Sequence, residues 1–179
     1  MGAPSGSIFI SYRRGDAPFA AHALYGQLAR RFPEQQIFMD VQGGVYAGDE
    51  FAEVIRRQVE RCDVLIALIG PDWDGVTDGH GQLRLQNPHD LVRQEICLAL
   101  RTQKRVIPVL VGGAAMPTAH SLPDDLAPLL DRNMFRLSHD HFVPECDRLI
   151  HEIQMALVHA DGERYQTRLR RSVESPEQN

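Results

Sequence analysis

The sequence VLIALI, residues 64–69, is an unbroken run of apolar residues. Three similar runs lie at residues 8–12, 37–39 and 106–111, and none of them alternates strictly with polar residues. Continuous apolar runs of this length are typical of strands that are buried on both faces of a parallel sheet. We therefore expect a strand at each of these four places.

Helical patterns separate the four runs. Apolar residues recur at helical spacing in three segments: Phe19, Ala20, Ala23, Leu24 and Leu28; Phe51, Val54, Ile55 and Val59; and Val92, Ile96, Ala99 and Leu100. Residues 135–137 could add a short edge strand, and Ile150, Ile153 and Leu157 indicate a closing helix. Strands that alternate with helices predict an α/β fold, here a parallel five-stranded sheet with helices on both faces.

If the strand order is 2-1-3-4-5, the ligand crevice falls between the carboxyl ends of the first and third strands. We expect Asp16 to cap the helix after the first strand, and Asn87 or Asp90 to open the helix after the third. Residues 112–128 are rich in Gly, Ala and Pro, which favours a loop with one short helical turn.

Length and composition favour one domain over residues 8–159, between a disordered N-terminus at 1–7 and a charged tail or linker at 160–179. The chain has 24 acidic and 19 basic residues, so it lacks the basic excess of a nucleic-acid-binding protein. No apolar run is long enough to cross a bilayer, and no signal peptide is evident, so we expect a cytoplasmic protein without membrane contact. The three cysteines are far apart, and no His, Cys or acidic residues lie at the spacing of a metal site.

Glu95 is the most informative polar residue. Its neighbours three and four positions away, Leu91, Val92, Leu98 and Ala99, are all apolar and share its face if the segment is a helix. Burying an unpaired carboxylate is costly, so this pattern indicates either a hidden partner or an acid that takes part in chemistry.

Several other residues follow the predicted strands and could border the same crevice. Arg13 and Arg14, next to Tyr12, could attract a phosphate at the start of a helix, or they could be solvated loop charges. Trp73 could stack on a planar ring at the mouth of the crevice, although closing the edge of the core is the commoner role. Asp40 could bond a ribose hydroxyl or cap a turn.

Patterns for phosphate-binding loops, serine hydrolases and zinc proteases are absent. A single carboxylate suits a reaction whose leaving group departs without protonation. Nicotinamide on NAD+ is such a group, because its cationic ring nitrogen becomes neutral as the bond to ribose breaks. A carboxylate could then stabilise the positive charge that develops on the ribose.

The chain resembles bacterial TIR (Toll/interleukin-1 receptor) domains from about residue 8 to residue 158. The resemblance rests on IFISYRR at 8–14, FMD at 38–40 with GDEF at 48–51, DVLIALIG at 63–70 with Trp73, DLVRQEI at 90–96 and VIPVLV at 106–111. It implies the flavodoxin-like fold already inferred.

The resemblance also implies an activity. Many family members cleave NAD+ to nicotinamide and ADP-ribose or a cyclised product, and Glu95 matches their essential glutamate. NAD+ is the substrate, and no cofactor is implied. The glycine-containing loop from Val41 to Asp49, with Gly48, matches the segment that lies at the self-association interface or over the substrate. Bacterial members commonly act in antiphage defence, with a sensor domain or partner chain as the trigger.

Two positions depart from the family pattern. Several NAD-cleaving members have an aromatic residue where this chain has Leu91, so one wall of the substrate site is changed. The proline that often precedes the glycine of the lid loop is Ala47 here. The leading hypothesis is an NAD+ glycohydrolase or cyclase; the alternatives are a non-catalytic TIR–TIR interaction module and, less favoured without a second acid, a nucleotide-sugar or deoxyribosyl transferase.

Overall fold

We analysed a computed structural model of the chain, which describes residues 6–39 and 51–174. The elements follow in the order β1 (Ile8–Tyr12), α1 (Pro18–Ala29), η1 (Glu34–Gln36), β2 (Ile37–Met39), α2 (Phe51–Arg61), β3 (Val64–Ile69), η2 (Arg84–Gln86), α3 (Leu91–Arg101), β4 (Arg105–Val111), η3 (Asp124–Leu129), β5 (Phe135–Leu137) and α4 (Phe142–Glu174). The four strands expected from apolar runs are therefore confirmed, as is the short edge strand.

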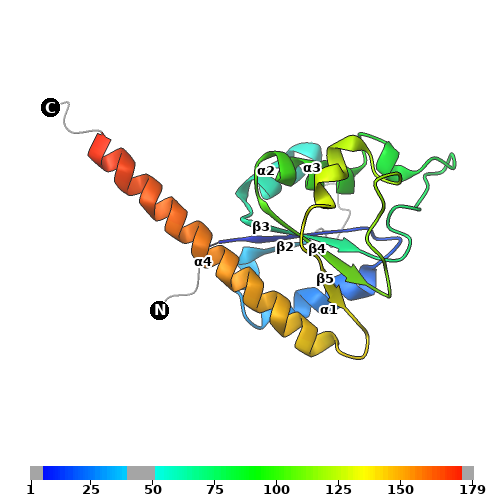
Figure 1. The fold of residues 1–179 in the computed structure, drawn as a ribbon, viewed down its shortest axis with the longest axis horizontal. Coiled ribbons are helices and arrows are strands. Elements are labelled where there is room, and N and C mark those ends of the chain that lie inside the picture. The colour runs from blue at the N-terminus through cyan, green and yellow to red at the C-terminus, as the bar shows by residue number, and fades with distance from the viewer. Residues whose placement is uncertain (1–5, 40–50, 175–179) are drawn as a thin grey trace.

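The strands form one parallel sheet in the order β2-β1-β3-β4-β5. Helices α2 and α3 cover one face, and α1 and α4 cover the other (Figure 1). This is the flavodoxin-like α/β arrangement that the sequence predicted. Because β1 pairs directly with β3, their carboxyl ends meet at the switch point of the sheet, where ligands bind in folds of this class.

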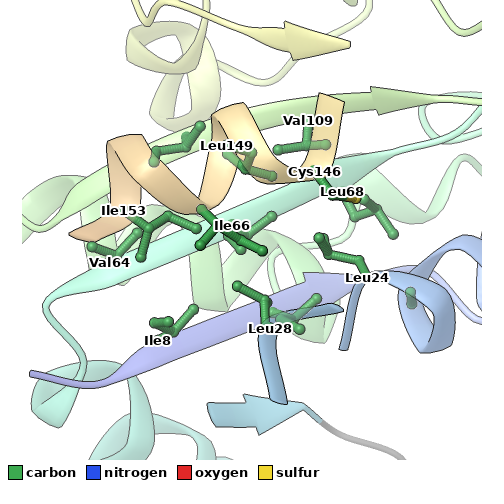
Figure 2. Packing of buried hydrophobic residues seen from close by; sticks show 14 of the residues in the cluster. Ile8, Leu24, Leu28, Val64, Ile66, Leu68, Val109, Cys146, Leu149 and Ile153 are labelled. Atoms are coloured by element: carbon green, nitrogen blue, oxygen red, sulfur yellow. The ribbon is translucent and has the colours of Figure 1, made fainter. Parts of the chain in front are cut away.

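Alternate residues of each strand enter different cores. On β1, Ile8, Ile10 and Tyr12 pack with α1 and α4, whereas Phe9 packs with α2 and α3. Figure 2 shows the first of these layers, in which Leu24 and Leu28 of α1 and Leu149 and Ile153 of α4 meet the sheet. The same alternation directs Ser11 toward the face that α3 covers.

The ordered domain begins before residue 8. The backbone N–H of Ser7 donates to the Asp63 carboxylate at 3.0 Å, and its hydroxyl donates to the carbonyl of Arg61 at 2.9 Å. Residues 6 and 7 therefore belong to the fold, whereas the sequence predicts a disordered N-terminus at 1–7. Among the described residues, no helix is both long enough and apolar enough to span a bilayer.

Helix α4 is longer than the sequence suggested. It continues through Gly162 to Glu174, where the sequence predicts a charged tail, a linker or a frayed helix. Its last turns project away from the sheet (Figure 1). Arg164 pairs with Asp63 and Asp161, and His159 contacts Glu163 one turn later. The Asp161–Arg164 and His159–Glu163 pairs lie three and four residues apart, a spacing that stabilises a helix on its surface.

Candidate active site

Glu95 lies on α3 and faces the carboxyl end of β1. Asp90 begins the helix as its N-cap and accepts a hydrogen bond from the backbone N–H of Arg93 at 3.1 Å. Glu95 follows in the second turn and is 5% exposed. The expected capping role of Asp90 is confirmed, and the burial that the apolar neighbours of Glu95 implied is confirmed as well.

The hidden partner of Glu95 is Ser11. The Ser11 hydroxyl donates a hydrogen bond of 2.5 Å to Oε2 of Glu95, and Ser11 itself is 1% exposed. A hydrogen bond from a hydroxyl to a carboxylate is short and strong when both groups are away from water. The carboxylate is thus held against the end of the strand rather than sealed among apolar side chains.

Glu95 also lines a small cavity of about 100 Å³ at this end of the sheet. The other lining residues come from β1 and the loop that follows it, from η2 and from the start of α3: Ile10, Tyr12, Arg13, Arg14, Arg84, Leu91 and Val92. The structure therefore brings four of the predicted site residues, Tyr12, Arg13, Arg14 and Leu91, together with Glu95. Pockets for drug-sized ligands have volumes of roughly 300–1,000 Å³, so the cavity holds only a fragment of a dinucleotide.

The sequence suggests that Arg13 either attracts a phosphate or is a solvated loop charge, but the structure shows a buried ion pair. It is buried and binds Asp90 through two hydrogen bonds of 3.0 Å, from Nη1 to Oδ2 and from Nη2 to Oδ1. Its Nε is buried and has no hydrogen-bond partner among the described residues. Its charge is therefore compensated within the protein instead of being a solvated charge or a free phosphate ligand.

Arg84 is a second cation beside Asp90, next to the Arg13–Asp90 pair. Its Nε lies 3.1 Å from Oδ2 of Asp90, and its side chain is partly exposed. Arg14 is exposed, so Arg84 and Arg14 are the cations of the cavity wall that solvent and a ligand can reach. Within the described part of the chain, Glu95 is the single carboxylate that lines the cavity.

Trp73 was wrongly placed at the mouth of the crevice. Its side chain is 1% exposed and packs in the core between the sheet, α2 and α3, and it does not line the cavity. The turn after β3 explains this position, because the Trp73 backbone N–H bonds back to the carbonyl of Gly70 at 3.3 Å. The commoner role of a tryptophan that closes the core is the one the structure shows.

Asp16 does not cap α1, whose N-cap is Ala17. Instead, its carboxylate accepts hydrogen bonds of 2.9 Å from the backbone N–H groups of Gly70 and Asp72. Burial raises the pKa of Asp16 above its ordinary value, although these two donors oppose the shift. Asp16 thus joins the loop after β1 to the loop after β3, the two loops that frame the switch point.

Three predicted site features lie outside the described residues: Asp40, Gly48 and the lid loop from Val41 to Asp49. The three cysteines are all buried and free, and burial raises the pKa of each thiol to about 12. In the part of the chain that the structure describes, no three His, Cys, Asp or Glu side chains cluster in a way that could hold a metal ion.

The sequence reasoning missed Ser11, Asp90 and Arg84 as members of the site. A signal for Ser11 was present, because a hydroxyl in a strand buried on both faces needs a hydrogen-bond partner. That partner lies 84 residues away in the sequence. Nothing in the spacing of Arg84 and Asp90 connects them to Arg13.

Comparisons with known proteins identify the family. The family model of the TIR domain matches residues 8–150. The TIR domain of the Toll-related receptor TRR-2 from Hydra magnipapillata is 18% identical, with a TM-score of 0.45 over 88% of this chain and 98% of that chain. A metazoan TIR-STING receptor from C. gigas, in complex with 2′,3′-cGAMP, is 16% identical, with a TM-score of 0.46 over 88% of this chain but 40% of that chain. Since the family model covers most of the sequence, this chain belongs to the TIR domain family.

Proposed function

We propose that this TIR domain cleaves the bond between nicotinamide and ribose in NAD+, with Glu95 as the catalytic carboxylate. The observation that carries the proposal is the position of Glu95: it is buried, lines a cavity at the switch point of the sheet and is the single acid in the described cavity wall. Buried titratable groups beside a cavity are concentrated at functional sites.

The reaction needs no general acid for its leaving group. As the C1′–N bond breaks, its electron pair moves to the nicotinamide nitrogen, which loses its formal positive charge. The ribose carbon becomes oxocarbenium-like, and the negative charge of Glu95 stabilises it in surroundings where water is scarce. Water then attacks C1′ and releases a proton to give ADP-ribose; attack by a ring nitrogen of the adenine gives a cyclic product instead.

The small volume of the cavity limits what it can hold. A ring-sized group fits into about 100 Å³, whereas the whole of NAD+ does not. We place the nicotinamide end of the substrate beside Glu95 and Leu91, and the phosphates toward the reachable cations Arg14 and Arg84. Asp40 and Gly48 would complete the site from outside the described residues.

We also propose that the activity depends on self-association through the loop from Val41 to Asp49, and that it serves antiphage defence in the cytoplasm under the control of a sensor domain or partner chain. The alternative is a non-catalytic module that only binds other TIR domains. The small cavity and the hydrogen bond that already engages Glu95 are the observations that favour this alternative.

One assay separates the two functions. The purified protein is incubated with NAD+ over a range of protein concentrations and with a crowding agent, and free nicotinamide is measured by chromatography. We expect release that rises more steeply than protein concentration, that Glu95→Gln abolishes and that Glu152→Gln, a change at an exposed site on α4, leaves intact. Release by Glu95→Gln at the wild-type rate would remove Glu95 from the reaction, and no release by the wild type under crowding would favour the interaction module.

A further inference from the structure

We propose that Ser11 is a positioning residue for Glu95, and that its hydroxyl sets the orientation and ionisation of the carboxylate during NAD+ cleavage. This inference rests on the proposed function. Ser11 itself does not line the cavity, so we expect it to act on the substrate through Glu95, the lining residue that its hydroxyl binds.

The geometry favours a fixed carboxylate. Ser11 lies on β1, an interior strand of the sheet, in register with Ala67 of the neighbouring β3. The hydrogen bond of 2.5 Å joins this strand to the second turn of α3, so a rigid element stands on each side of it. Catalytic groups held between strands and helices are oriented more narrowly than groups on loops.

The chemistry of the hydrogen bond gives it a second effect. A hydroxyl that donates to a carboxylate favours the ionised form, whereas burial favours the neutral acid. Glu95 is 5% exposed, so burial acts strongly against the charge that the reaction needs. The other titratable and charged groups around the cavity are Tyr12, Arg13, Arg14 and Arg84, with Asp90 bound to Arg13 and Arg84. They are the same in every Ser11 variant, so a change in the pH profile between variants reports the hydroxyl. The Ser11 hydroxyl favours the ionised carboxylate, and its removal should therefore confine the activity to a higher pH range.

A purely structural role would have different consequences. A buried hydroxyl that served packing alone could be replaced by a methyl group with little effect on turnover. Folding does not depend on this hydrogen bond alone, because the buried Arg13–Asp90 pair ties the same strand end to the start of the same helix. Variants at Ser11 should therefore fold and still bind substrate.

The test uses four forms of the full chain: wild type, Ser11→Ala, Ser11→Thr and Ser11→Val. Threonine and valine have nearly the same shape, so a difference between them reports the hydroxyl and not the added bulk. We expect Ser11→Ala to lower kcat by about 10- to 100-fold, as for a misplaced catalytic group, with KM changed by less than about twofold. The acidic limb of its activity–pH profile should move to higher pH. Ser11→Thr should retain much more activity than Ser11→Val.

Two results would overturn the positioning role while leaving the proposed function intact. One is a Ser11→Ala enzyme with the kcat and pH profile of the wild type, while Glu95→Gln is inactive. The other is equal impairment of Ser11→Thr and Ser11→Val, which also decides the matter if Ser11→Ala does not fold. No nicotinamide release by the wild type would overturn both proposals together.

Discussion

The guanidinium of Arg13 and the carboxylate of Asp90 form a two-pronged ion pair in which both side chains are 1% exposed. Removing one partner of such a pair leaves an uncompensated buried charge, which typically costs about 3–5 kcal/mol. We expect Asp90→Asn, which leaves Arg13 buried without its anion, to lower the free energy of unfolding by about that amount, measured by urea denaturation. Arg13→Met should cost less, because Arg84 still pairs with Asp90. Asn caps helices as well as Asp does, so Asp90→Asn removes the charge of the pair while it keeps the helix cap.

Arg14→Met is the matched control for that experiment, because Arg14 follows Arg13 directly and is exposed. Its effect should be within about 0.5 kcal/mol. Equal losses for Arg13→Met and Arg14→Met would show that the buried pair contributes no more than a surface charge.

Gly70 lies against the carboxylate of Asp16, where an added Cβ would overlap the carboxylate atoms. We expect Gly70→Ala to destabilise the protein by about 1–3 kcal/mol, because it forces Asp16 away from the two N–H groups it accepts from. Thermal unfolding measures this effect. Gly15→Ala in the neighbouring loop meets open space and should change stability little; if both variants melt together, the close contact at Gly70 is not a constraint.

The fold could be predicted from the sequence because its strands are buried on both faces. Residues 64–69 are all apolar, so the ends of the run define the ends of the strand. The predicted and observed bounds of β3 coincide. The extent of α4 could not be predicted, because the sequence after Gly162 is charged and polar and has no core-facing apolar pattern. Around Gly162 the helix carries local pairs such as Asp161–Arg164, and composition alone does not distinguish such a helix from a charged linker.

Only part of the site could be predicted from the sequence, for a different reason. The apolar neighbours of Glu95 predicted its burial, because helical spacing fixes which residues share a face. Its partner and that of Arg13 are tertiary contacts across 84 and 77 residues, and no local pattern encodes them. Trp73 was misplaced because a strand end and its turn allow an indole to point either to solvent or to the core.

The burial of Trp73 can be tested by fluorescence, since it is the only tryptophan in the sequence. Its burial predicts a blue-shifted emission that acrylamide quenches only after unfolding, and that NAD+ does not quench. Trp73→Phe should cost about 1–3 kcal/mol of stability through lost packing and leave KM for NAD+ unchanged. Strong quenching of the native protein by NAD+ would return the indole to the substrate site.

Glu145, near the start of α4, accepts hydrogen bonds from the backbone N–H and the hydroxyl of Ser138. The backbone donor is the larger cause that holds the pKa of Glu145 below its ordinary value of 4.5. An acid with a depressed pKa stabilises the fold above its unfolded pKa, and this contribution is lost as the pH falls through the folded value. Glu145→Gln should therefore lower the melting temperature at pH 7, and this difference should shrink as the pH falls through the folded pKa of Glu145; a difference independent of pH would assign the effect to shape.

The direction of α4 has a practical consequence. The helix starts beside the carboxyl end of β5, meets Asp63 at the amino end of β3 through Arg164, and then extends about 15 Å further. Tyr165 is exposed, so a label or a linker to a surface could be attached near it. The attachment point would then lie on the part of α4 that extends away from Glu95. The protein could thus be immobilised for binding measurements with the Glu95 cavity left open to NAD+.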